Sequence, residues 1–392
     1  MHESLIDLDD AATWRHLVPA EPEALPPGAW PNDTVFARPT RERTRVSKWP
    51  NSPHIKSVQP DHYYDIYEDD FFSQTHRIIT PETPIGSMGS CFATRIAHQL
   101  QLWKYNYVLE EDDLPADIPA EHVANTSYRM APARCGTLFD APSMRQVVER
   151  AFGLWMPPRM VARRGGRLID PFRTINQSFA TIEEYDADRE AHTQALRRAL
   201  LKCDVFVLTL GLTEAWQLAR GGDYVSVPQL AAAPELFRRR RLSLEENLAE
   251  LERLFAVYRA HKPDLQLIVS VSPVPLNKTF SAEHIVVANS LSKSVLRVAA
   301  EEFVARHPGV VHYFPSYEAV LYGTRHPWEP DMRHVSPEAV ARVMRLFQKM
   351  FLVEQEPLPL TAHQSAFVPE RFSVARRAVR GARRALRLLR GR

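Results

Sequence analysis

Residues 83–103, TPIGSMGSCFATRIAHQLQLW, contain the change of pattern that decides the fold. A short apolar lead-in ends in the glycine-containing run 86–90. Beyond this run, apolar residues recur at the spacing of one helix face; they are Phe92, Ile96, Leu100 and Trp103. Glycines at such a corner let the backbone turn sharply and approach another group closely. The stretch therefore predicts a strand that leads directly into a helix.

Ser90 stands at this strand-to-helix corner. Its hydroxyl would lie beside the first-turn N–H groups of the helix, where developing negative charge is favoured. The position therefore suits a nucleophile. The alternative is that Ser90 only caps the helix, since serine is among the preferred N-cap residues. Taken alone, the stretch favours the cap.

From residue 204 onward, strand and helix patterns alternate. Apolar runs at 205–210, 265–271 and 309–314 have the continuous hydrophobicity of strands covered on both faces. Helices are predicted at 243–260, opened by a Ser243–Glu246 capping box, at 282–305, and from Ser336 onward. This alternation predicts an α/β fold with a parallel sheet between two helical layers. Sites in such sheets form beyond the carboxyl ends of strands, so Ser90 and 211–213 should share one edge.

The chain is predicted to have three parts. Residues 1–80 form an irregular, proline-rich arm, 81–352 the catalytic domain, and 353–392 a linker with a basic tail. Within the domain, 105–200 shows few clear strands and could form a cap over the site or a substrate-facing insertion. Two helices are expected there, at 143–152 and 187–202. The arginine run 238–241 is predicted to be a solvated loop.

Composition excludes several classes of protein. The chain has 392 residues and a formal net charge of +2, so bulk charge indicates no partner. No apolar run approaches the roughly 20 residues that cross a bilayer, and the acidic start lacks the layout of a signal peptide, which predicts a cytoplasmic location. Cys91, Cys135 and Cys203 form no Cys-x-x-Cys pair and suggest neither a disulfide framework nor a zinc or other metal site. No nucleotide-binding glycine fingerprint appears, so no cofactor is expected.

The end of the chain is rich in arginine. Over residues 372–390, apolar residues repeat at alternating spacings of three and four, and arginines fill the other faces. A basic amphipathic helix of this kind is typical of an element that binds an anionic membrane surface or an acidic partner. Gly381 within the pattern supports a disordered tail instead, and both interpretations stay open. Nucleic acid is not expected as a partner, because no aromatic stacking platform accompanies the arginines.

A second candidate group stands late in the chain. Asp331 precedes His334 by three residues, directly ahead of the helix that begins at Ser336. An aspartate so placed on a loop can orient the imidazole so that its other nitrogen faces a hydroxyl. Such pairs are common by chance, and only the combination with Ser90 and 211–213 makes this one a candidate.

These residues resemble a known family. Residues 89–93 spell the signature that names the GSCFA family, and 209–216, 272–276 and 288–294 look like its further blocks, in the same order. That family is in turn similar to the SGNH/GDSL hydrolases, whose fold is a flavodoxin-like three-layer sandwich. The resemblance covers residues 84 to about 350. It implies that fold and a serine hydrolase activity.

The resemblance also implies roles by position. Ser90 would be the nucleophile, His334 the general base, and Asp331 the residue that orients His334. The N–H groups of Ser90 and Gly211 would face the developing oxyanion, with the side chain of Thr213 completing the hole. The sequence departs from the hydrolase pattern because no aspartate precedes Ser90 and because Thr213 stands where an asparagine normally donates.

Other residues near these motifs have two interpretations each. Cys91, at a helix N-terminus, could be the nucleophile with His334. A structural role is favoured, since a free cysteine is commonly buried as a small hydrophobe. Asn289, His326 and Trp328 are candidate substrate-binding residues, although Trp328 could equally serve packing.

The leading interpretation is an SGNH-like serine hydrolase, an esterase or deacylase, that acts through an acyl-enzyme on an O-acylated small molecule or glycan. An O-acyltransferase that modifies a bacterial glycan would use the same triad, with a sugar hydroxyl in place of water. A third possibility is a non-catalytic scaffold on the same fold, held at the membrane periphery by the basic tail.

Overall fold

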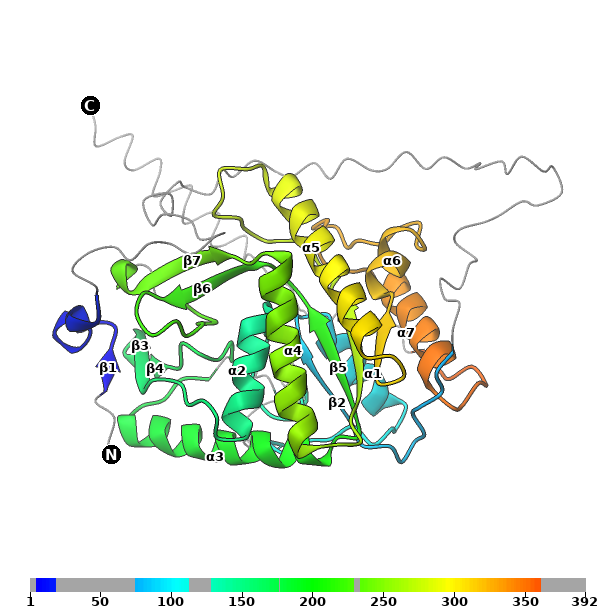
Figure 1. The fold of residues 1–392 in the computed structure, drawn as a ribbon, viewed down its shortest axis with the longest axis horizontal. Helices are drawn as coiled ribbons and strands as arrows, with labels where there is room; N and C mark the ends of the chain where they lie inside the picture. Colours follow the sequence, from blue (N-terminus) through cyan, green and yellow to red (C-terminus); the bar gives the residue numbers. More distant parts are fainter. Residues whose placement is uncertain (1–4, 19–74, 113–127, 176, 229–232, 361–392) are drawn as a thin grey trace, which may run out of the picture.

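A parallel sheet of four strands forms the centre of the molecule. The computed structural model describes residues 5–18, 75–112, 128–175, 177–228 and 233–360. The sheet consists of β2 (Ile85–Gly89), β5 (Val205–Leu210), β8 (Gln266–Val271) and β9 (Val311–Phe314), adjacent in that order (Figure 1). All residues of β2 and β5 are buried. The predicted strand 205–210 is confirmed to the residue, and the other two begin one and two residues later than expected.

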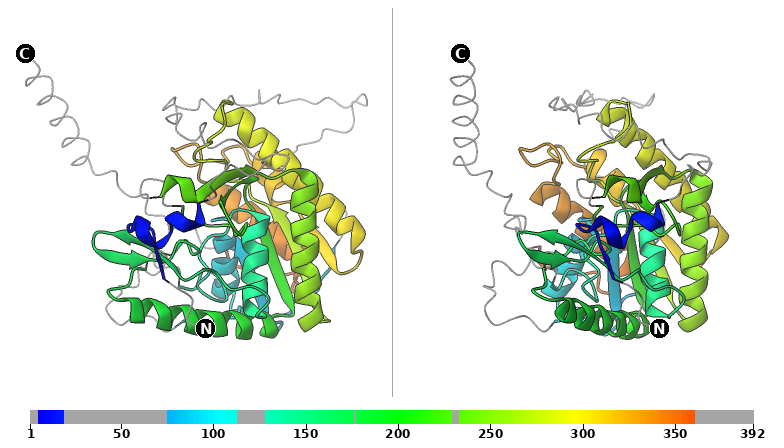
Figure 2. Two further views of the ribbon diagram at one scale, coloured as in Figure 1. Left: turned by 60° about the vertical axis from the view of Figure 1, so that its left-hand side comes forward. Right: turned by 90° about the vertical axis from the view of Figure 1, so that its left-hand side faces the viewer.

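Helices cover both faces of this sheet (Figures 1 and 2). One layer holds α2 (Ala141–Ala151), α3 (Ile182–Lys202), α4 (Leu244–His261) and α5 (Ile285–Arg306), and the other holds α1 (Ala93–Leu102), α6 (Ser316–Leu321) and α7 (Pro337–Phe351). Alternate residues of β5 enter the two cores: Phe206 and Leu208 pack under the first layer, and Val205 and Val207 under the second. The predicted three-layer α/β sandwich is confirmed.

The edge beyond β2 explains how this sheet relates to a flavodoxin-like one. In that order the second strand of the chain lies outside the first. Here Tyr107 alone pairs in parallel with Ile85, and the Ile85 N–H donates to Asn106 O at 3.0 Å while the Val108 N–H donates to Ile85 O at 2.9 Å. A single bridge therefore occupies the place of the second strand.

The helix-opening signals in the sequence are also confirmed. Ser243 and Glu246 form both bonds of the capping box at the start of α4, and Ser336 caps α7 with proline in its first turn. Helix α3 begins five residues earlier than expected, capped by Thr181.

The prediction of a solvated loop at 238–241 is wrong. These residues belong to β7 (Phe237–Arg241), which pairs antiparallel with β6 (Glu214–Leu218). Arg239 and Arg240 are only 2% and 5% exposed. Arg240 is held by hydrogen bonds to Gln217 and to Glu246 of α4. The Gln217 amide and the Glu246 carboxylate, which belong to other elements, thus compensate the burial of Arg240. A run of four arginines does not by itself suggest that any of them is buried.

The flanking parts are described only in part. Residues 5–18 contribute β1 (Ile6–Asp7), which pairs with β3 (Met160–Arg164) beside β4 (Arg167–Ile169). Residues 75–80 of the predicted arm are also described, and Ile79 forms a parallel bridge with Leu352. The rest of the arm, residues 1–4 and 19–74, and the basic segment 372–390 lie outside the described residues. Between 128 and 202 the chain supplies α2 and α3 to one helical layer, so this region is part of the sandwich. The domain boundaries stay a prediction.

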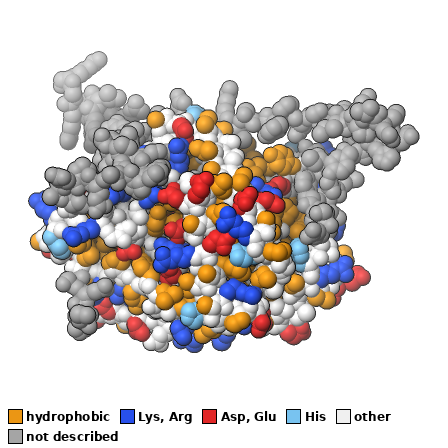
Figure 3. Space-filling view, in the orientation of Figure 1, with side chains coloured by type: hydrophobic (Ala, Val, Ile, Leu, Met, Phe, Trp, Pro, Cys, Tyr) orange, Lys and Arg blue, Asp and Glu red, His pale blue; other side chains and the backbone are white. Residues whose placement is uncertain are grey.

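The surface is mixed in character. On the face in Figure 3, acidic and basic side chains are interspersed with apolar ones, as a net charge of +2 allows. Within the described ranges, no helix combines the length and apolar character that a membrane crossing requires.

Candidate active site

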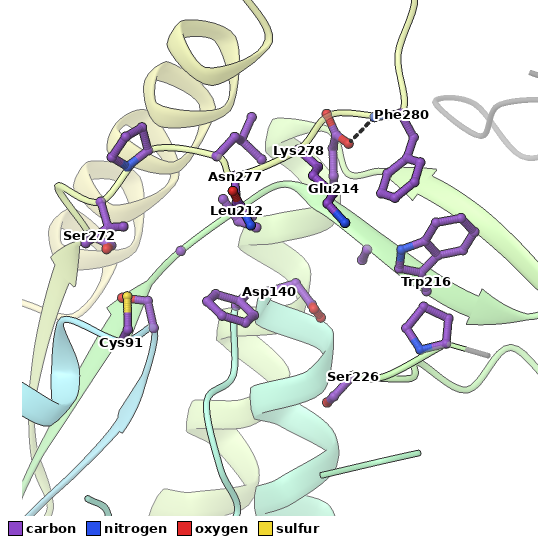
Figure 4. Close-up of a pocket in the computed structure, with 18 of the residues that line it drawn as sticks. Cys91, Asp140, Leu212, Glu214, Trp216, Ser226, Ser272, Asn277, Lys278 and Phe280 are labelled. Carbon is purple, nitrogen blue, oxygen red and sulfur yellow. Dashed lines mark hydrogen bonds between the residues drawn. The ribbon is translucent and has the colours of Figure 1, made fainter. Parts of the chain in front are cut away.

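A cavity of about 390 Å³ lies at the carboxyl ends of β2, β5 and β8 (Figure 4). Ser90, Gly211 and Ser272 are the first residues after these three strands, and all three line it. Arg333, from the loop that holds Asp331 and His334, lines it too. The structure thus brings to one edge of the sheet the three distant segments on which the sequence analysis placed the site.

The corner at Ser90 depends on the glycine before it. Gly89 has a φ of +142°, and a Cβ there would lie 2.3 Å from Thr209 O, so both conformation and space require glycine. The Ser90 N–H donates to the same carbonyl oxygen at 3.1 Å. The Ser90 side chain is buried, and its Oγ accepts the N–H of Phe92 at 3.3 Å. The capping interpretation is wrong, because the N-cap of α1 is Phe92 and no side chain caps this helix. The Ser90 hydroxyl instead bonds the backbone just before α1, and Ser90 lines the cavity.

The loop between α6 and α7 holds the acid–imidazole pair. His334 Nδ1 is hydrogen-bonded to Asp331 Oδ2, and Asp331 Oδ1 accepts the His334 N–H at 3.0 Å. Burial acts to raise the pKa of Asp331, but the backbone N–H groups of His334 and Arg333 and the imidazole outweigh it, so this pKa is lower than usual. An antiparallel bridge between Trp328 and Val335 closes the base of the loop.

The contacts of the imidazole indicate its tautomer. Arg333 Nη1 lies 3.4 Å from His334 Nε2, and a guanidinium can only donate. With Nδ1 facing a carboxylate and Nε2 facing a donor, the ring carries its proton on Nδ1. Nε2 is then the nitrogen that can accept a proton. A hydrogen bond from Ser90 to this nitrogen stays a prediction.

The two backbone N–H groups expected to bind the oxyanion are already engaged. The Ser90 N–H donates to Thr209 O, and the Gly211 N–H donates to Phe139 O at 3.0 Å. The Thr213 N–H donates to Ser292 Oγ at 3.0 Å, and the Thr213 side chain is buried outside the cavity wall. Each backbone donor would have to exchange its partner to face an oxyanion, so their role stays a prediction.

Ser272 is a donor that the sequence analysis missed. Its side chain is buried and lines the cavity, and its Oγ has no hydrogen-bond partner among the described residues. A buried hydroxyl without a partner is costly, and it can donate to a substrate at no loss of another bond. The available signal was positional: Ser272 follows β8 as Ser90 follows β2.

Lys293, on α5, is a second residue to which the sequence analysis assigned no part in the reaction. Its side chain is buried, and its Nζ donates to Gly211 O at 2.7 Å. No carboxylate pairs with it in the described part of the chain. Burial lowers the pKa of Lys293 to about 7, helped by Arg333, while Cys91 acts in the opposite direction. A titratable cation with so perturbed a pKa beside a cavity is a mark of functional sites.

Comparison with known proteins identifies the family. The GSCFA family model matches residues 84–347, from just before β2 to within α7. The chain belongs to the GSCFA family. No curated protein matches it.

Among solved structures, this GSCFA protein is similar to two esterases. One is an acetyl esterase mutant with acetate ion, at 10% identity and a TM-score of 0.32, with 67% of this chain and 92% of that chain covered. The other is a carbohydrate esterase family 3 from Talaromyces cellulolyticus, at 10% identity and a TM-score of 0.31, with 68% and 94% covered. The function of the GSCFA protein is therefore argued from its own side chains.

Cys91, the cysteine of the GSCFA signature, lines the cavity and is half-buried. Burial raises the pKa of its thiol, although Arg333, Lys293 and Arg95 act to lower it. A thiol that stays protonated is a poor nucleophile. This supports the structural interpretation of Cys91 and leaves Ser90 as the candidate.

The three candidate substrate-binding residues lie outside the cavity wall, and one of them, Asn289, contacts a residue of that wall. Asn289 Oδ1 accepts the N–H of Leu276, which does line the cavity, at 3.1 Å. The carbonyl oxygen of His326 accepts the Ser336 hydroxyl at 2.6 Å, and Trp328 packs against the apolar core beneath α7. None of the three is in the wall formed by the described residues, so their contact with substrate stays a prediction.

Proposed function

We propose that this protein is a serine esterase or deacylase that cleaves O-acyl esters of a small molecule or glycan through an acyl-enzyme at Ser90. The observation that carries the proposal is the shared cavity. Its wall includes Ser90 and also Arg333, which belongs to the loop in which Asp331 holds His334.

Each group has one role in the reaction. His334 Nε2 takes the Ser90 proton as Oγ attacks the ester carbonyl, and His334 then returns that proton to the departing alcohol. Water, activated by the same imidazole, releases the acid and restores Ser90. Asp331, whose pKa is lowered, stays ionised and stabilises the imidazolium that forms.

The negative charge on the carbonyl oxygen needs donors at the same end of the cavity. The Ser272 hydroxyl is placed to serve without breaking another bond. The ammonium of Lys293 lies behind Gly211, where its field favours negative charge in a buried site. Together they would supply what the engaged backbone N–H groups do not.

Acyl transfer is the second candidate. It needs the same residues and a bound alcohol acceptor in place of water. The cavity continues beyond Ser90 to Trp216 and Phe280, which leaves room for an acceptor. Incubation with an acyl donor, with and without a glycan acceptor, distinguishes the two by the appearance of acylated glycan or free acid.

Labelling with a fluorophosphonate probe tests the proposal. We expect the wild-type protein to be labelled and to hydrolyse 4-nitrophenyl acetate, and Ser90→Ala to do neither while keeping its melting temperature. Ser294→Ala, at an exposed serine of α5, is the matched control and should behave as wild type. Hydrolysis by Ser90→Ala at the wild-type rate would exclude Ser90 as nucleophile and point to Cys91. A wild-type protein that is neither labelled nor active would favour the scaffold interpretation.

A further inference from the structure

The cavity has a second end, built by the β6–β7 hairpin and the loop 277–280. Figure 4 shows Trp216 and Phe280 across the cavity from Cys91 and Ser272. The Trp216 and Phe280 rings meet edge to face, with centroids 5.1 Å apart, which fixes the orientation of the half-buried indole. This end therefore presents an aromatic surface at a distance from the nucleophile.

Basic side chains outnumber acidic ones in the cavity wall; the basic ones are Arg239, Lys278 and Arg333. Arg239 pairs with Trp216 in the β6–β7 register. Burial lowers its pKa to about 10, so it is still a cation at neutral pH. Lys278 is exposed at the rim and forms no ion pair with the residues that the structure describes.

The two carboxyl groups of the wall are held by other protein groups. Glu214 accepts the Thr279 hydroxyl at 2.6 Å and the Phe280 N–H at 3.2 Å. Asp140 caps α2 by accepting the Ser143 N–H at 2.9 Å, and burial raises its pKa to about 6. Glu214 offsets the charge of Arg239, whose pKa it acts to raise, and the N-terminus of α2 compensates Asp140. Lys278 is therefore the cation at this end that an anionic ligand can meet.

We infer that the Trp216 end binds the alcohol part of the ester, and that this alcohol is a sugar carrying a carboxylate or phosphate group. The inference rests on the proposed function. The apolar C–H face of a sugar ring fits a fixed indole, and the anionic group would meet Lys278. A long alkyl chain in the same place would remove cations from water and give them no acceptor.

Three acetylated sugars test the inference by their kcat/KM for acetate release. They are a mono-O-acetylated methyl glucuronoside, the same compound as its uronate methyl ester, and a mono-O-acetylated glucose 6-phosphate. The first two differ at one group only, a charged carboxylate against its neutral methyl ester. We expect the uronate to be preferred over its methyl ester by about tenfold, the scale of one charge-assisted contact. Comparison with the phosphate shows which anion is bound.

Two substitutions assign the preference to this end of the cavity. Lys278→Gln should bring the ratio of charged to neutral sugar close to one. Trp216→Leu should raise KM for all the sugars. Lys104→Gln, at an exposed lysine beyond the C-terminus of α1, should keep the wild-type ratio. Equal kcat/KM for the uronate and its methyl ester, or a ratio that survives Lys278→Gln, would overturn the inference. So would a preference for 4-nitrophenyl octanoate over acetate that Trp216→Leu removes, because this end would then hold the acyl chain.

A failure of this inference can be distinguished from a failure of the proposed function. Ser90-dependent cleavage of 4-nitrophenyl acetate without charge discrimination would contradict this inference alone. If no ester is cleaved, calorimetric binding of methyl glucuronoside and its methyl ester to Ser90→Ala protein still tests the subsite. Tighter binding of the charged sugar supports it, and equal binding overturns it.

Discussion

Replacing Lys293 by methionine should stabilise the fold while it impairs the enzyme. The side chain is buried, and among the described residues it makes one hydrogen bond, to Gly211 O at 2.7 Å. Methionine has a similar length and no charge. It removes the amino group whose protonated form we expect to favour negative charge near Ser90, and it relieves the cost of placing that group in a buried site.

The size of the effect follows from the lysine pKa. Burial lowers it from 10.5 to about 7, so the unfolded chain holds more protons between these values and stability rises with pH across that window. Below pH 7, the buried lysine lowers the free energy of unfolding by its full amount. At pH 7.5 the difference from 10.5 is three pH units, which corresponds to about 4 kcal/mol. The variant also loses the hydrogen bond to Gly211 O, which lowers its gain in stability by about 1 kcal/mol. Lys293→Met should therefore be about 3 kcal/mol more stable than wild type at pH 7.5.

Urea unfolding at pH 7.5 and at pH 10.5 measures this difference. At pH 10.5 the lysine is neutral in the folded state and half protonated in the unfolded chain, so only about 0.4 kcal/mol of the cost remains and the gain should disappear. Lys104→Met, at an exposed lysine, should change stability by no more than about 0.5 kcal/mol at either pH. At the same time, kcat for 4-nitrophenyl acetate should fall by about tenfold or more in Lys293→Met. A variant that is less stable than wild type by the same amount at both pH values would refute the reasoning.

Two further predictions concern the reacting groups. Ser272→Ala should lower kcat about a hundredfold with little change in KM or melting temperature, because its hydroxyl has no bond to lose in the free protein; a fall in melting temperature with unchanged kcat would contradict this. Asp331→Asn should lower kcat and also stability at neutral pH. The pKa of Asp331 is lowered in the folded state, so the ionised carboxylate stabilises the fold above its ordinary pKa of 3.8 and this stabilisation is lost as the pH falls through the lowered pKa. In urea titrations at acid pH, the free energies of unfolding of the wild type and of Asp331→Asn should therefore converge.

The framework of the fold could be predicted because its signals are local. The run 205–210 is apolar throughout, since β5 is covered on both faces. Ser243 and Glu246 predict the start of α4, because the bonds of their capping box lie within a single turn. The bridge at Tyr107 and the strand β7 could not be predicted in this way. The first is one residue long, and the second buries arginines whose partners, such as Glu246, come from another element.

The site was predictable where it depends on chain geometry and not where it depends on contacts between layers. Gly89 and Ser90 form a corner that the sequence itself specifies. Lys293, in contrast, looks like a solvent-facing residue. A weak signal existed, because Lys293 lies three residues before Leu296 and so close to the face of α5 that carries buried residues. What holds its ammonium is a backbone carbonyl of the β5 exit, which no pattern of side chains reveals.

The block 288–294 has a physical reason to accompany the GSCFA corner. Two consecutive residues of α5 bind the exit of β5: Ser292 Oγ accepts the Thr213 N–H, and Lys293 donates to Gly211 O. From the opposite side, Phe139 O accepts the Gly211 N–H. An exit held at three points by separate elements cannot turn its N–H toward a substrate without breaking one of these bonds. We therefore expect the developing charge at Ser90 to be met by side chains that have no bond to give up, with the Ser272 hydroxyl first among them.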